Sequence, residues 1–151
     1  NERNRYIANL IEAKGFTIKD QPQWSKSSAG KKSGEIDIFV TENDGKPRSI
    51  IEALNLDSLK TDYLIEHLDK LFNYDTTGLE NNYILSYATA KDFIKLWDKY
   101  KVFISKHKYI YEFIDFKEND DYNYADVKIG VAKHLRNGKT IHCRLFYYFG
   151  G

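Results

Sequence analysis

The sequence contains few of the features that mark secreted or membrane-spanning proteins. Its 151 residues include a single cysteine, Cys143, so an internal disulfide is excluded and a reducing compartment is favoured. No apolar run approaches the roughly 20 residues that a membrane-spanning helix needs. No signal-peptide pattern is present. We therefore expect a cytoplasmic protein with no membrane partner.

The sequence also lacks an excess of either charge. There are 23 Lys and Arg residues against 22 Asp and Glu residues. Net charge therefore does not indicate nucleic-acid binding, and any basic surface must be local. Aromatic residues are abundant, with 12 Tyr, 9 Phe and 2 Trp, and we expect most of them in sheets and core. The length suits one domain, residues 1–151, with a sizeable core.

Several motifs of catalysis and cofactor binding are absent from the sequence. There is no Cys/His cluster for zinc, no dinucleotide fingerprint, and no Ser-His-Asp set at a nucleophile turn. The stretch "AGKKSG" (29–34) has glycine and lysine but lacks the spacing of a P-loop. Cys143 alternates with apolar residues, which predicts an inert thiol in the core.

The hydrophobic pattern predicts an alternation of helices and strands. Helices are expected over 2–14 and about 58–73, and a third is expected to be capped by Thr89, with Asp92 three residues on. Residues 108–116 are ambiguous, and Asn137-Gly138 predicts the tight turn of a hairpin over 124–149. Further strands are expected over 16–18, 35–40, 49–56 and 83–87. The fold class is therefore α/β, with a central mixed sheet flanked by helices and a C-terminal antiparallel hairpin extension.

Two acidic residues interrupt predicted strands, Asp37 in "EIDIFV" and Glu52 in "SIIEALNL". A buried strand normally excludes carboxylates, because removing an ionised group from water is costly. If the two strands pair, the carboxylates approach each other, and a divalent cation would relieve their repulsion. Oxygen ligands favour Mg²⁺, Mn²⁺ or Ca²⁺. The alternative is that each carboxylate lies on a solvated face or pairs with a lysine.

The order of these elements resembles the core of the PD-(D/E)xK nuclease superfamily, which has a restriction-endonuclease-like core. The resemblance spans about residues 2–100 and rests on "GEIDIFV", "IIEAL", an amphipathic helix and "NNYILSY". Asp37 and Glu52 match its two strand acids, and Glu2 is the closest match to a third metal ligand on the first helix, ahead of Glu12. The resemblance implies Mg²⁺ or Mn²⁺ as cofactor and hydrolysis of phosphodiester bonds.

The polar loop before "GEID" resembles a segment that lies next to the substrate in this superfamily. The resemblance implies nucleic acid as partner, with DNA ahead of RNA. The residues that it would direct to the phosphates are Gln21, Gln23, Ser27, Lys31 and Lys32.

One residue departs from the superfamily pattern, because Leu54 stands where a lysine is expected. The lysine's role could have moved to Lys60, Lys32 or Lys14, or the carboxylates could act with one metal alone. Alternatively, the domain is inactive and binds nucleic acid or protein. A weaker alternative is a metal-free interaction domain with an unrelated α/β fold.

The ends of the sequence and its histidines add further expectations. The chain begins at Asn1 without methionine and ends in two glycines, so we expect a segment of a larger protein, by analogy a bacterial defence or effector protein. Its other domains, or a second copy of the chain, are then candidate partners. His67 lies on the apolar stripe of its helix and is expected to be structural, although that helix can pack beside the site in the resembling fold. His134 and His142 are expected to be solvated.

Overall fold

The computed structural model describes residues 2–19, 37–121 and 124–150. Its order of elements follows the sequence-based expectation, and the ambiguous segment forms a strand, β5. The elements are α1 (Glu2–Ala13), β1 (Thr17–Lys19), β2 (Ile38–Thr41), β3 (Pro47–Leu56), α2 (Thr61–Tyr74), β4 (Asn81–Ala88), α3 (Phe93–Lys106), β5 (Glu112–Glu118), β6 (Val127–Arg136) and β7 (Lys139–Phe149).

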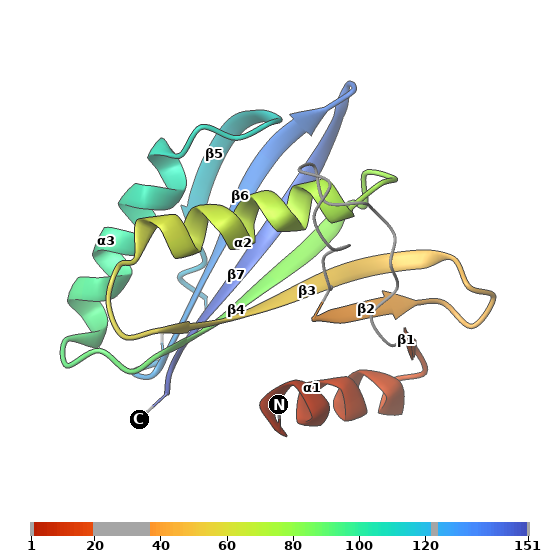
Figure 1. Ribbon diagram of the computed structural model, residues 1–151, viewed down its shortest axis with the longest axis horizontal. Coiled ribbons are helices and arrows are strands. Elements are labelled where there is room, and N and C mark those ends of the chain that lie inside the picture. Colours follow the sequence, from red (N-terminus) through yellow and green to blue (C-terminus); the bar gives the residue numbers. More distant parts are fainter. Residues whose placement is uncertain (1, 20–36, 122–123, 151) are drawn as a thin grey trace.

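The strands form one open, mixed sheet in the order β1-β2-β3-β4-β7-β6-β5 (Figure 1). β1, β2 and β3 are antiparallel, β3, β4 and β7 are parallel, and β7, β6 and β5 are antiparallel. The predicted α/β class and mixed sheet are therefore confirmed. The C-terminal hairpin is part of this sheet rather than an addition to its margin, because β7 pairs with β4 from Asn81 to Ala88. Its turn has positive φ at Asn137 (48°) and Gly138 (80°), as the Asn-Gly pair predicts.

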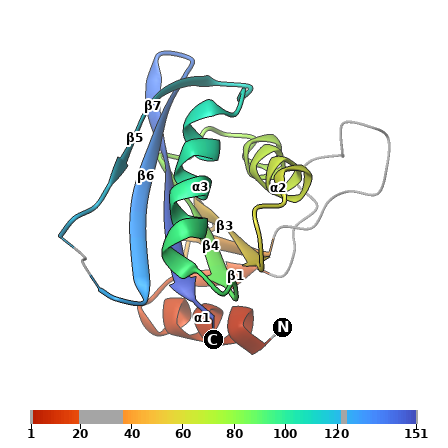
Figure 2. The same ribbon diagram turned by 90° about the vertical axis from the view of Figure 1, so that its left-hand side faces the viewer.

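Helices cover the two faces of the sheet unequally. Figure 2 shows α2 and α3 together on one side of it, with α1 apart from them. The larger core cluster joins α2 and α3 to the first face of the sheet. A smaller cluster joins α1 to the second face, through Ile7 and Ile11 against Ile38, Val40 and Ile51. No helix in the described part of the chain has the length and apolarity that a membrane crossing requires.

Two local predictions are wrong. Thr89 does not cap α3; Asp92 does, because its carboxylate accepts a hydrogen bond from the Lys95 backbone N–H at 2.9 Å and the helix begins at Phe93. His134 is not solvated, since its side chain is fully buried beside the rings of Phe72 and Tyr109. Burial lowers the pKa of His134 to about 4, so the imidazole is neutral at neutral pH.

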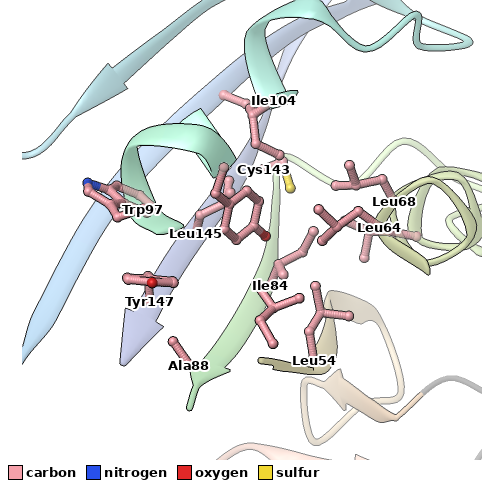
Figure 3. Close-up of a cluster of buried hydrophobic side chains, with 14 of the residues drawn as sticks. Leu54, Leu64, Leu68, Ile84, Ala88, Trp97, Ile104, Cys143, Leu145 and Tyr147 are labelled. Atoms are coloured by element: carbon pink, nitrogen blue, oxygen red, sulfur yellow. The ribbon is translucent and has the colours of Figure 1, made fainter. Parts of the chain in front are cut away.

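Leu54 belongs to the core. Its side chain is fully buried and lies in the cluster drawn in Figure 3, with Leu64, Leu68 and Ile84. Cys143 lies in the same cluster, and burial raises the pKa of its thiol, so its predicted inertness has a structural cause. A lysine at position 54 would place an ammonium group among these hydrocarbon side chains.

We predict that Leu54→Lys lowers the free energy of unfolding by about 3–5 kcal/mol, because it leaves an unpaired charge in the core. Leu54→Met, which keeps the volume and apolarity, is expected to cost less than about 1.5 kcal/mol. Urea denaturation of both variants measures the difference. Equal stability of the two variants would contradict the placement of Leu54 in the core.

Candidate metal and phosphate site

The pairing of β2 with β3 brings Asp37 and Glu52 together. Ile38 is opposite Ile51 in this antiparallel pair, so the preceding residue, Asp37, faces Glu52. The Asp37 carboxylate accepts a hydrogen bond from the Ala53 backbone N–H at 2.8 Å, which holds it against β3. The two strand acids singled out in the sequence therefore lie side by side.

Glu52 is fully buried, and its two carboxylate oxygens differ in their surroundings. Oε2 lies 3.4 Å from His67 Nδ1 and 3.4 Å from Lys70 Nζ. Oε1 has no hydrogen-bond partner among the described residues. Burial raises the pKa of Glu52 and the charge of Asp37 raises it further, whereas His67 and Lys70 act in the opposite direction. Ionisation of Glu52 is therefore less favourable in the folded protein than in water.

The groups that oppose this cost come from α2. His67 and Lys70 are three residues apart and so share one side of the helix. The buried residues Leu64, Leu68 and Leu71 hold α2 against the sheet, and this orientation directs the flanking His67 and Lys70 towards β3. The ring of Tyr63 packs edge-on against His67 at 4.4 Å between centroids. The side chains of His67 and Lys70 are only 19% and 20% exposed, so these contacts are largely shielded from water.

Sequence reasoning missed Lys70 and treated His67 as structural. The available signal was their spacing, which places Lys70 one turn after a histidine that was already assigned to the inner side of its helix. Two of its three lysine candidates, Lys60 and Lys14, lie elsewhere in the structure, and the third, Lys32, is outside the described residues. Lys60 Nζ is 3.1 Å from Asp57 Oδ1 at the exposed start of α2, and Lys14 lines a groove beside α1.

Of the remaining predicted residues the structure describes Glu2, and it does not bring Glu2 to the pair. Glu2 is exposed in the first turn of α1, and α1 packs on the face of the sheet opposite to Glu52. The polar loop lies outside the described residues, and so does Glu35. The loop residues concerned are Gln21, Gln23, Ser27, Lys31 and Lys32.

The described part of the chain contains no group of three or more His, Cys, Asp or Glu side chains arranged to hold a metal ion. Asp37 and Glu52 provide two carboxylates. Two is also the number that Mg²⁺ commonly takes from a protein when water and substrate phosphate complete its six positions. The donor set thus fits a magnesium-type ion that shares its coordination with a phosphate.

Comparisons with models of protein families, with curated proteins and with solved structures find no match to this chain. The structure itself shows an α/β fold with a seven-stranded mixed sheet and three helices among the described residues. The function must therefore be inferred from the geometry around Glu52.

We predict that Glu52→Gln raises the free energy of unfolding at pH 7 without divalent cations. The folded protein raises the pKa of Glu52 above its ordinary value of 4.5, so wild-type stability falls as the pH rises through this interval. Glutamine cannot ionise and avoids this loss, and each pH unit between the folded and unfolded pKa corresponds to about 1.4 kcal/mol.

Thermal denaturation at pH 7 and at pH 4 in the presence of a chelator tests this prediction. The gain in stability should be large at pH 7 and small at pH 4, where Glu52 is mostly protonated in both the folded and the unfolded state. Glu66→Gln, on the exposed side of α2, is the matched control and should change little at either pH. A Glu52→Gln variant that is less stable than wild type at pH 7 would show that Lys70 and His67 outweigh the burial of Glu52.

Proposed function

We propose that this domain is a metal-dependent nuclease that hydrolyses phosphodiester bonds, with one Mg²⁺ or Mn²⁺ ion held by Asp37 and Glu52. The observation that carries this proposal is the pair of carboxylates at the junction of β2 and β3. Asp37, just before β2, lies opposite Glu52 of β3, and Glu52 is fully buried. The order α1-β1-β2-β3-α2-β4 supports a restriction-endonuclease-like core. DNA ahead of RNA as substrate, and a parent protein in bacterial defence, rest on the resemblance alone.

Among the described residues, no donor reaches Oε1 of Glu52. A buried carboxylate oxygen without a donor is costly, because burial removes it from water and no hydrogen bond compensates for that loss. A divalent cation between Asp37 and Glu52 would supply the absent partner and remove the repulsion between the two carboxylates. When bound, such an ion polarises the phosphate and lowers the pKa of an attacking water.

We assign the role of the superfamily lysine to Lys70. Its ammonium group reaches Glu52 from α2, whereas position 54 on the strand is occupied by a core leucine. With a cation held by Asp37 and Glu52, the Lys70 ammonium would be available to contact the phosphate and to stabilise the negative charge that develops when water attacks phosphorus. Lys70 therefore replaces Lys60 as the catalytic lysine of this proposal.

A second candidate function is a catalytically inactive module of the same fold that binds nucleic acid or protein. Two observations favour it: Leu54 occupies the lysine position, and the ion pairs of Glu52 with Lys70 and His67 already offset part of its charge. In that case Lys70 is a permanent counter-ion of Glu52 rather than a catalytic group.

We predict that Lys70→Met lowers nuclease activity about 10²–10³-fold, the loss typical of removing one group that stabilises transition-state charge. Lys60→Met is the matched control, because the Lys60 side chain pairs with exposed Asp57 rather than with Glu52, and the activity of this variant should stay within about twofold of wild type. Plasmid DNA, single-stranded DNA and RNA are the substrates, each with Mg²⁺ or Mn²⁺. Cleavage that persists in an Asp37→Asn, Glu52→Gln double variant would refute the site.

Cation binding can be tested without activity. We predict that Mg²⁺ or Mn²⁺ at ten times its dissociation constant stabilises the wild type by about 1.4 kcal/mol, because it binds only the folded state. Thermal denaturation should show this gain in wild type and in Lys60→Met, and none in Asp37→Asn. Stabilisation without cleavage would favour the inactive module, whereas no stabilisation would contradict the metal site itself.

A further inference from the structure

A second candidate binding site lies on the opposite face of the sheet. Beside α1, a groove of about 340 Å³ opens between Ile7 and Ile11 of the helix and the outward-facing side chains of β4 and β7. α1 packs next to this part of the sheet through the smaller core cluster (Figure 1). A concave, mostly apolar space of this size suits a small organic group. It is separate from the Asp37–Glu52 pair, whose buried carboxylate faces α2.

Three aromatic rings of β4 and β7 line the sheet side of the groove, beside the aliphatic side chains of Val40, Ile51 and Leu85. Tyr83 and Phe146 lie 6.1 Å apart between ring centroids with an angle of 31° between their planes, and Phe146 and Tyr148 lie 6.3 Å apart at 12°. All three side chains are half-buried, so part of each ring faces the groove. Near-parallel aromatic surfaces favour a flat, aromatic ligand over a branched aliphatic one.

The charged side chains in the described lining of the groove are both positive. Among the described residues that line it, Lys14 and Arg48 are charged and none is a carboxylate. Arg48 lies 3.7 Å from Glu42, but both side chains are well exposed (61% and 44%), so this ion pair is weak and leaves the guanidinium available. The groove therefore combines flat apolar surfaces with two cations, which complements a flat ring that carries a negative group.

We propose that this groove binds a nucleotide, with the base against Tyr83, Phe146 and Tyr148 and the phosphate on Lys14 and Arg48. A free mononucleotide and one nucleotide of a single strand share this chemistry. The proposal does not depend on catalysis at Glu52, because the two sites use different faces of the sheet.

Binding of two probes to the full chain, in a chelator so that no cation is present, tests this proposal. The probes are AMP, by calorimetry, and a fluorescein-labelled oligothymidylate of about ten residues, by fluorescence anisotropy. At least one probe should bind. Tighter binding of AMP would indicate a free mononucleotide as the ligand, and tighter binding of the oligothymidylate would indicate one nucleotide of a single strand. Oligonucleotide binding through two phosphate contacts should weaken about sevenfold between 50 and 200 mM salt.

Three variants separate the parts of the groove. Lys14→Gln with Arg48→Gln is expected to weaken binding at least tenfold, and Phe146→Leu about tenfold through lost stacking. Lys139→Gln, exposed at the β6–β7 turn, should bind as wild type does. Thermal denaturation of each variant verifies that it is folded.

Three results would overturn the proposal. The first is that neither probe binds at about 1 mM. The second is that the Lys14→Gln, Arg48→Gln variant keeps the full affinity of the wild type. The third is that octanoate, an aliphatic anion, binds more tightly than AMP.

Discussion

The burial of the Glu52 carboxylate is the constraint on which the candidate site depends. An ionised group without water is costly, and the antiparallel pairing of β2 with β3 adds Asp37 to the same place. The partial compensation from His67 and Lys70 requires α2 to lie across β3 in one orientation. The leucines of α2 fix that orientation by packing into the core. Core packing and site chemistry are therefore coupled through one helix.

Leu54 and Lys70 together show how the chain can keep a lysine at the site without placing it on the strand. The side chain of residue 54 points from the same face of β3 as Glu52, but α2 and α3 enclose it in hydrocarbon. Lys70 approaches the same carboxylate from the helix, where part of its side chain still reaches water. The positive charge beside Glu52 thus comes from a helix, and position 54 of the strand contributes to the core.

Much of the fold, and half of the candidate site, could be predicted from the sequence. Asp37 and Glu52 were predictable because strand alternation and a short turn determine which side chains face each other. Lys70 was not, because the residue of a helix that meets a strand carboxylate depends on the rotation and crossing of that helix. His134 was misjudged because its closeness to the hairpin turn suggested solvent. The alternating apolar residues of this strand, Val127, Ile129 and Val131, lie on the other face, whereas Ala132 and His134 are buried.

A crystal structure of the protein with Mn²⁺ would show whether Asp37 and Glu52 together bind a divalent cation. We expect one anomalous peak between the two carboxylates, with an oxygen of each about 2.0–2.6 Å from the ion. We also expect Lys70 to move away from Glu52. A structure at saturating Mn²⁺ with no peak there, and with the Glu52–Lys70 pair still at its 3.4 Å separation, would refute cation binding at this pair.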